Sequence, residues 1–329
     1  MKPSQVVAAV KHLVTLQRPG FIWGPPGIGK SDAIRQVGRE LKLEVIDKRL
    51  AQCDPTEIKG YPVPDMTKKI MRFLHDESLP TKGKGILFLD ELPHAPQAVQ
   101  AVAFQLALDR RIGTYELPPG WSVVAAGNRT TDRSGANVVN AALANRFVHI
   151  DMEVDPEDWV DWAAKNGVSD LMRGYIRYRP KNLCIDKIEP GARAFNTPRS
   201  VTFADKILSD PNIDDELKVK LVTGTVGEGI AAEMYGYFRS HKSLVNLDRV
   251  MIEPENAPLP EGASATYAVI SALETRAEVG NVDRLMKYVK RLPKEFQTVF
   301  IEAITRKDTE LAETRAYVDW IRENRALLK

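Results

Sequence analysis

Residues 24–31, with the sequence GPPGIGKS, constrain the fold more than any other part of this chain of 329 residues. They follow a short apolar run at 21–23, which predicts a strand. They precede residues 31–41, whose apolar positions fall on one side of a helix. Glycines at such a junction let backbone N–H groups turn inward around phosphate oxygens. The pattern G-x-x-x-x-G-K-[ST] therefore predicts a phosphate-binding loop between a strand and a helix.

The residues of this loop have predicted roles in binding ATP. The ammonium of Lys30 reaches the β- and γ-phosphates, and the hydroxyl of Ser31 ligates Mg²⁺. The helix that begins there adds the positive end of its dipole. The nucleotide-binding residues that we predict are Gly24, Pro25, Pro26, Gly27, Ile28, Gly29, Lys30, Ser31 and Asp32.

A second motif, GILFLDE at residues 85–91, ends an apolar strand with two carboxylates. Ligands of open α/β sheets bind outside the carboxyl ends of the strands, so both side chains are expected beside the loop. We expect Asp90 to hold Mg²⁺ together with Ser31. We expect Glu91 to act as the general base that polarises an attacking water.

Strand and helix signals alternate through the first half of the chain, which favours a parallel α/β sheet. Residues 54–83 are rich in proline, glycine and charge, and we expect a loop there with a short helix near 68–74. After about residue 153 the pattern is helical, with a proline-rich linker at 241–262. The predicted strands are 21–23, 43–50, 86–89, 121–126 and 147–152, and the helices between them include 96–108 and 137–145.

The two consecutive acids and the helical second half resemble the AAA+ family of ATPases. VVAAGNR at 123–129 is similar to that family's sensor 1 strand and implies that Asn128 contacts the γ-phosphate or the attacking water. ALANRFVHI at 142–150 resembles the segment that carries an arginine finger, here Arg146. NTPRSV at 196–201 resembles sensor 2, here Arg199. Arginine suits both roles because its planar fork matches phosphate oxygens and stays protonated.

This resemblance implies an α/β fold, a P-loop NTPase parallel sheet that forms the AAA+ core, followed by an all-helical lid and a helical C-terminal extension. The corresponding boundaries are 1–153 for the nucleotide-binding core, 154–241 for the lid and 242–329 for the linker and extension.

Within AAA+ proteins the chain is most similar to the MoxR branch. DELPHAP at 90–96, LANRF at 143–147 and TPRS at 197–200 are its counterparts of that branch's motifs. Pro93 and His94 depart from the Asn and Arg of the branch. In that branch an acidic residue precedes the arginine finger, and Asn145 takes its place in this chain. Residues 109–121 correspond to the branch's pre-sensor hairpin.

The resemblance further implies a homo-oligomeric ring, most often a hexamer, in which Arg146 reaches the ATP of the neighbouring subunit. Arg129 and Arg133 are rival fingers because both closely follow Asn128. Tyr61, in the segment 54–65, is a candidate for gripping a polypeptide in a central channel. Proteins of the MoxR branch remodel or activate a partner protein, often one with a von Willebrand factor A domain.

Two other functions stay open at this point. A nucleic-acid motor or restriction-type translocase would use the same ATPase core, although 46 Lys and Arg against 44 Asp and Glu give a net charge of only +2. The basic and aromatic stretch 173–181 could contact nucleic acid, but the favoured interpretation is a lid helix whose amphipathic arginines cover its own core. A small-molecule kinase would leave Asn128 and Arg146 unexplained. No apolar run approaches the length of a membrane span, and we expect a cytoplasmic protein with two thiols, Cys53 and Cys184.

Overall fold

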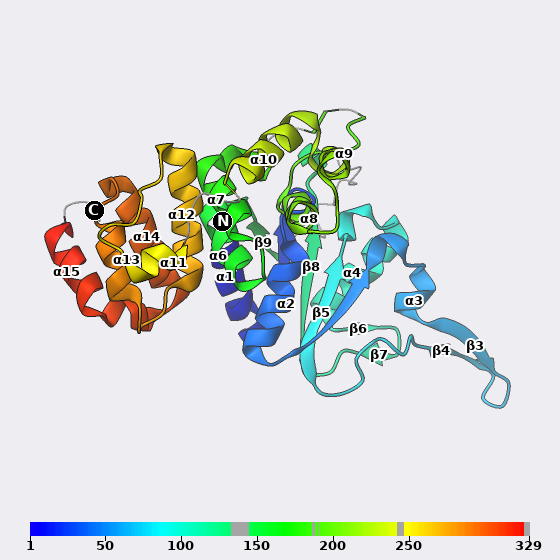
Figure 1. Ribbon diagram of the computed structural model, residues 1–329. Coiled ribbons are helices and arrows are strands. Elements are labelled where there is room, and N and C mark those ends of the chain that lie inside the picture. The colour runs from blue at the N-terminus through cyan, green and yellow to red at the C-terminus, as the bar shows by residue number, and fades with distance from the viewer. Residues whose placement is uncertain (133–144, 186–187, 190, 242–246, 326–329) are drawn as a thin grey trace. The chain divides into compact units, whose positions relative to one another are not determined.

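The computed structural model describes residues 1–132, 145–185, 188–189, 191–241 and 247–325 (Figure 1). The chain divides into two compact units, Met1–Asp155 and Pro156–Lys329. The first unit is a sheet covered by helices, and the regular elements among the described residues of the second unit are all helices. Whether the second unit divides further into a lid and an extension stays a prediction.

Five parallel strands form the sheet of the first unit, in the order β2-β5-β8-β1-β9. Strand β1 lies inside the sheet, between β8 and β9. Its carboxyl end is therefore flanked by the carboxyl ends of both neighbours, and ligands of such sheets bind at this edge. The predicted α/β fold with a parallel sheet is confirmed. The strands are β1 (Gly20–Trp23), β2 (Glu44–Arg49), β5 (Lys84–Asp90), β8 (Gly120–Gly127) and β9 (Val148–Asp151).

Helices bury both faces of this sheet, which explains why β5 and β8 are almost continuously apolar. On one face, Phe104 of α4 (Gln97–Asp109) packs in a cluster with Phe21 and Leu87. On the other, α2 (Lys30–Leu41) approaches β2 so closely that a Cβ on Gly38 would lie 2.3 Å from Val45 Cγ2. Helix α1 (Pro3–Thr15) is tied to β8 by a 3.0 Å bond from Ser122 Oγ to the Val14 carbonyl.

The predicted short helix near 68–74 is wrong. After α3 (Pro55–Lys59), an antiparallel hairpin forms from β3 (Tyr61–Asp65) and β4 (Ile70–Leu74), and it extends away from the sheet (Figure 1). A segment of seven residues is too short for a stable isolated helix. Pairing with β3 supplies β4 with its hydrogen bonds. A second hairpin, β6 (Arg111–Ile112) and β7 (Tyr115–Glu116), lies inside 109–121 as expected.

The second unit is built from helices, as predicted for the residues after about 153. The expected linker 241–262 is partly helical, and the predicted helix 137–145 of the first unit lies almost wholly outside the described residues. The helices are α6 (Pro156–Lys165), α7 (Asp170–Tyr178), α8 (Pro198–Ser209), α9 (Asp215–Val226), α10 (Glu228–His241), α11 (Leu247–Ile252), α12 (Gly262–Arg276), α13 (Val282–Val289), α14 (Lys294–Lys307) and α15 (Arg315–Glu323).

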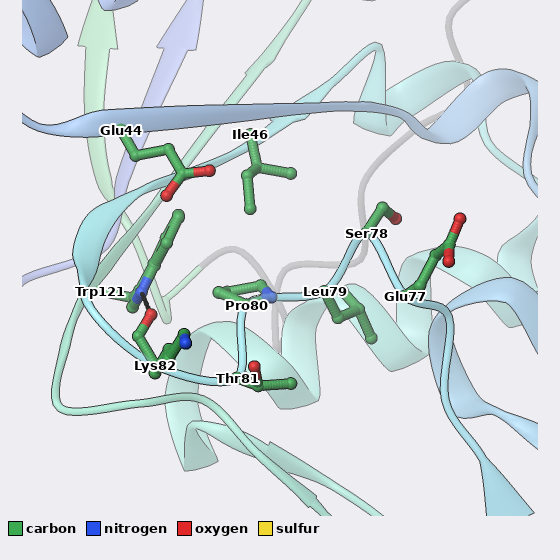
Figure 2. A pocket seen from close by; sticks show the side chains of 9 residues that line it. All are labelled: Glu44, Ile46, Glu77, Ser78, Leu79, Pro80, Thr81, Lys82 and Trp121. Atoms are coloured by element: carbon green, nitrogen blue, oxygen red, sulfur yellow. Dashed lines mark hydrogen bonds between the residues drawn. The ribbon is translucent and has the colours of Figure 1, made fainter.

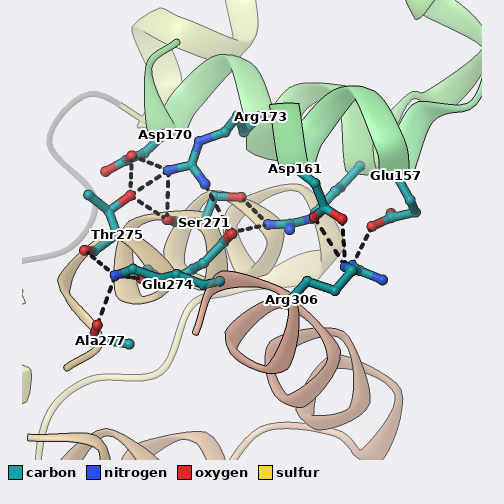
Figure 3. A network of polar contacts seen from close by, with 11 residues as sticks. Glu157, Asp161, Asp170, Arg173, Ser271, Glu274, Thr275, Ala277 and Arg306 are labelled. Atoms are coloured by element: carbon teal, nitrogen blue, oxygen red, sulfur yellow. Dashed lines mark hydrogen bonds and ion pairs between the residues drawn. The ribbon is translucent and has the colours of Figure 1, made fainter. Parts of the chain in front are cut away.

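A buried cluster of charges joins α7 to α12 in this unit (Figure 3). Arg173 Nη1 and Arg177 Nη1 both donate to Glu274 Oε2, at 2.9 and 2.8 Å, and all three residues are at most 6% exposed. Arg173 also pairs with Asp170, which is closer to the surface. The carboxylates of Glu274 and Asp170 together thus balance the charge of the two desolvated guanidinium groups.

A neighbouring cluster joins α14 to α6. Arg306 Nη2 donates to Glu157 Oε2 at 2.9 Å, and Arg306 Nε donates to Asp161 Oδ1 at 3.1 Å. The two clusters therefore connect the first helices of this unit to helices about a hundred residues or more later in the chain.

Replacing Glu274 by Gln should lower the free energy of unfolding by about 3 kcal/mol, because Arg173 and Arg177 would stay buried without their shared counter-charge. Urea denaturation measures this change. The matched control is Glu216→Gln, since Glu216 is 79% exposed and pairs with Lys220 on the same helix. The control should change the free energy by less than about 0.5 kcal/mol. Equally small effects for both variants would contradict the structural role of Glu274.

Candidate functional site

Backbone geometry explains the glycines of the loop at residues 24–31. Gly29 caps the start of α2 with a φ of 98°, a left-handed conformation that glycine adopts without strain. A Cβ on Gly24 would lie 2.5 Å from Ile28 Cδ1 and 2.8 Å from the Met152 carbonyl oxygen, so no larger side chain fits. The loop therefore starts at the carboxyl end of β1 and leads directly into the first turn of α2.

Lys30 is the buried charge at the centre of the site. The residue is 9% exposed, and its Nζ donates to the carbonyl oxygens of Gly24 and Pro25, at 2.6 and 2.8 Å, and to Asn128 Oδ1 at 2.7 Å. These three acceptors are neutral oxygens. An ammonium held in this way is suited to bind an anionic group that enters the loop.

Ser31 and Asp90 meet at the same edge of the sheet. Ser31 Oγ donates to Asp90 Oδ2 at 2.8 Å, which joins the first turn of α2 to the tip of β5. A hydroxyl and a carboxylate are oxygen ligands of the kind that Mg²⁺ prefers. Together with the ammonium of Lys30 and the N–H groups of the loop, this donor set fits the phosphates of a nucleotide with a divalent cation.

Glu91 follows Asp90 in a left-handed backbone conformation, with a φ of 57°. Its backbone N–H donates to Asp90 Oδ1 at 2.9 Å. The residue is exposed, and within the described part of the chain its carboxylate has no hydrogen bond or ion pair. A non-glycine residue at positive φ is uncommon and is often found at functional sites. The carboxylate of Glu91 is thus available to accept a proton from water.

Asn128 completes the group of predicted residues that the structure brings together. It follows β8, is half-buried, and contacts the site through Lys30. Lys30, Ser31, Asp90, Glu91 and Asn128 therefore gather at the carboxyl ends of β1, β5 and β8.

The arginines predicted to act on phosphate have different surroundings. Arg129 donates through Nε and Nη2 to Asp151 Oδ1, at 2.9 and 2.7 Å, so it is held within its own unit. Arg133 lies outside the described residues. Arg146 precedes β9, is partly exposed, and forms no hydrogen bond or ion pair with any described residue. Arg199 is exposed in the first turn of α8, which belongs to the second unit.

Two residues near the site were not predicted from the sequence. Asp47 lies on β2, the strand beside β5, and Arg35 of α2 donates to its Oδ2 at 3.3 Å. Burial, and then the charge of Asp90, raise the pKa of the Asp47 carboxyl. The only signal in the sequence is an acid near the end of the second strand, which is too common to single out.

A hollow of about 350 Å³ lies at the other end of the sheet (Figure 2). Its lining includes Glu44, at the start of β2, and Trp121, near the start of β8, whose Nε1 donates to the Lys82 carbonyl at 3.0 Å. The loop at residues 24–31 lies at the opposite, carboxyl end of the strands. The hollow is therefore separate from the site described above.

The described residues show two further features that bear on function. None of their helices is long and apolar enough to cross a membrane. Among them, no group of three or more His, Cys, Asp or Glu side chains could hold a metal ion, and neither Cys53 nor Cys184 forms a disulfide.

A comparison with known protein families finds a match within the first unit. Residues 21–151 match the model of the family described as ATPase family associated with various cellular activities (AAA). This span runs from β1 to β9 and includes the site. The match covers most of the first unit, so this part of the chain is similar to that family.

Solved structures with a similar chain path have low sequence identity. A point mutant of RuvB from Thermotoga maritima is 16% identical, with 82% of this chain and 79% of that chain covered and a TM-score of 0.43. NtrX from Brucella abortus in complex with ATP is 15% identical, with 92% and 68% covered and a TM-score of 0.42.

Lys30→Ala should weaken the binding of ATP by roughly 100-fold or more, because it removes the charged donor that faces the phosphates. Isothermal titration calorimetry measures this change. Lys68→Ala, at an exposed position on the loop between β3 and β4, is the matched control and should bind ATP as the parent does. Unchanged affinity in Lys30→Ala would show that the loop does not hold the phosphates.

Proposed function

We propose that this protein is an AAA+ ATPase that hydrolyses ATP to ADP and phosphate with Mg²⁺. The observation that carries the proposal is the joint position of Lys30, the Ser31–Asp90 pair and Glu91 at one edge of the sheet. Each of these residues supplies a part that hydrolysis of a phosphoanhydride needs.

The residues would divide the chemistry as follows. Lys30 and the N–H groups of the loop bind the phosphates, and Lys30 exchanges its carbonyl partners for phosphate oxygens. Ser31 and Asp90 hold Mg²⁺, which neutralises charge on the β- and γ-phosphates when bound. Glu91 accepts a proton from the attacking water, and Asn128 orients that water or the γ-phosphate.

Glu91→Gln should leave ATP binding intact while turnover falls by roughly 100-fold or more, because the amide keeps the shape of the side chain but cannot accept the proton. Phosphate release measures turnover, and calorimetry measures binding. Glu116→Gln, on β7, is an exposed control in the same unit and should keep the parental rate. Parental turnover in Glu91→Gln would mean that another group activates the water.

The same proposal includes a ring of identical subunits, most often a hexamer, of the MoxR type. Its support is Arg146, which precedes the edge strand β9 and has no partner among the described residues, whereas Arg129 is engaged by Asp151. Arg146 would complete the site of the neighbouring subunit and stabilise charge on the γ-phosphate in the transition state. Arg199 would act as sensor 2 from the lid.

Mixing two inactive variants tests this arrangement. Arg146→Ala alone should bind ATP but lose roughly 10³-fold in turnover. A ring that combines Arg146→Ala and Glu91→Gln subunits contains interfaces with an intact Glu91 on one side and an intact Arg146 on the other. Part of the activity should therefore return on mixing and should rise with protein concentration. Inactivity of a verified mixed ring, or full activity of Arg146→Ala alone, would contradict a finger in trans.

We further propose that ATP hydrolysis remodels or activates a protein client, with a protein bearing a von Willebrand factor A domain as the candidate partner. The support is the hairpin β3–β4, whose large side chains are unusually exposed. Tyr61 is 66% exposed, Leu74 opposite it is 64% exposed, and Met66 at the turn is 81% exposed. Exposed aromatic and methionine side chains bind apolar segments without a strict sequence requirement.

The alternative of a nucleic-acid motor has weaker support. Arg173 and Arg177, in the basic stretch 173–181, are committed to Glu274 and buried, so they offer no charge to a phosphate backbone. The net charge of +2 adds no general attraction. ATPase activity that DNA stimulates in a steeply salt-dependent manner would favour the motor over the chaperone.

A further inference from the structure

Asp47 lies beside the proposed metal ligands without being one of them. Strands β2 and β5 pair in parallel, with Asp47 opposite Phe88 and Arg49 opposite Asp90. Side chains alternate between the faces of a sheet, so Asp47 and Asp90 project from the same face on neighbouring strands. This is the face that α2 covers, and Ser31 lies in the first turn of α2.

Arg35 does not fully account for the charge of Asp47. It lies one turn after Ser31 and divides its donors between Asp32 Oδ1, at 3.0 Å, and Asp47 Oδ2, at 3.3 Å. The Arg35 side chain is 47% exposed, whereas that of Asp47 is 27% exposed. Ion pairs with a solvated partner contribute little. The Asp47 side chain is thus only partly buried, and besides the positive charges of Arg35 and Arg49 it experiences the like charge of Asp90.

We propose that Asp47 is a positioning residue for the divalent cation, a second negative charge that attracts Mg²⁺ to Ser31 and Asp90. The inference rests on the proposed nucleotide site and adds a residue to it. A divalent cation beside Asp90 relieves the repulsion between the two carboxylates, so each of them stabilises the ion. Arg35 opposes this effect, because its positive charge repels the cation while its hydrogen bond orients Asp47.

A purely structural role for Asp47 would give a different result on mutation. If Asp47 only anchors Arg35, and so ties α2 to β2, then removing either partner has the same consequence. If Asp47 acts by its charge on the cation, the two substitutions change the affinity for Mg²⁺ in opposite directions. Asp47→Asn keeps an oxygen that can accept from Arg35 but removes the charge. Arg35→Gln removes the cationic partner and leaves the carboxylate in place.

The experiment is a calorimetric titration of ATP into the full-length protein, at a series of Mg²⁺ concentrations and in excess chelator. Asp47→Asn should need about tenfold more Mg²⁺ for the same gain in ATP affinity, as expected for one unit charge near a divalent ion at a partly screened site. In chelator the same variant should bind ATP as tightly as the parent or more tightly. Arg35→Gln should need no more Mg²⁺ than the parent.

The outcomes separate this inference from the proposed function. Equal loss of affinity with and without Mg²⁺ in Asp47→Asn, or the same loss in both variants, would overturn the role of Asp47 while the parent still binds ATP with Mg²⁺. A parent that binds no ATP under any condition would overturn the nucleotide site itself. Thermal unfolding of both variants at the parental temperature confirms that the comparison concerns folded protein.

Discussion

The buried ammonium of Lys30 is the interaction on which the site depends. It donates to the start of the loop, at Gly24 and Pro25, and to Asn128 after β8. These groups meet because β1 and β8 are neighbours in the sheet, with Trp23 opposite Gly127. A desolvated charge is costly unless it is fully hydrogen-bonded. The strand order thus has a direct chemical consequence, since it allows one lysine to contact both the loop and the residue that follows a different strand.

The buried charges of the second unit differ from Lys30 in their partners. There the buried guanidinium groups of Arg173 and Arg177 are compensated inside the protein by Glu274, and neither of them is offered to a ligand. Replacing such a buried pair by well-packed apolar side chains is often neutral, whereas removing one partner is strongly destabilising. They also join α7 to α12, on either side of the boundary near residue 241 that composition had suggested. The proposed lid and extension therefore share buried contacts, and we expect them to respond together to substitutions in this cluster.

Local signals predicted the elements around the site well and failed where pairing decides the structure. The glycine pattern at 24–31 and the acids after 86–89 have direct physical reasons, so the strand, loop and helix followed from them. Residues 70–74 form a strand because they pair with residues 61–65, and no local pattern predicts that pairing. Asp47 was missed for the same reason, since its relation to Asp90 exists only once β2 pairs with β5. The burial of Arg173 likewise depends on Glu274, which is distant in the chain.

A structure determined with Mg²⁺ and a non-hydrolysable analogue of ATP tests whether the loop at residues 24–31 holds a nucleotide. We expect the β- and γ-phosphates to contact Lys30 Nζ and the N–H groups of residues 24–31, and we expect Ser31 and Asp90 to hold the metal. Lys30 Nζ should then no longer donate a hydrogen bond to at least one of the two carbonyl oxygens, that of Gly24 or that of Pro25. Phosphates bound elsewhere, for example in the hollow beside Glu44 and Trp121, or a Lys30 that keeps both carbonyls and Asn128 with the analogue bound, would contradict this expectation.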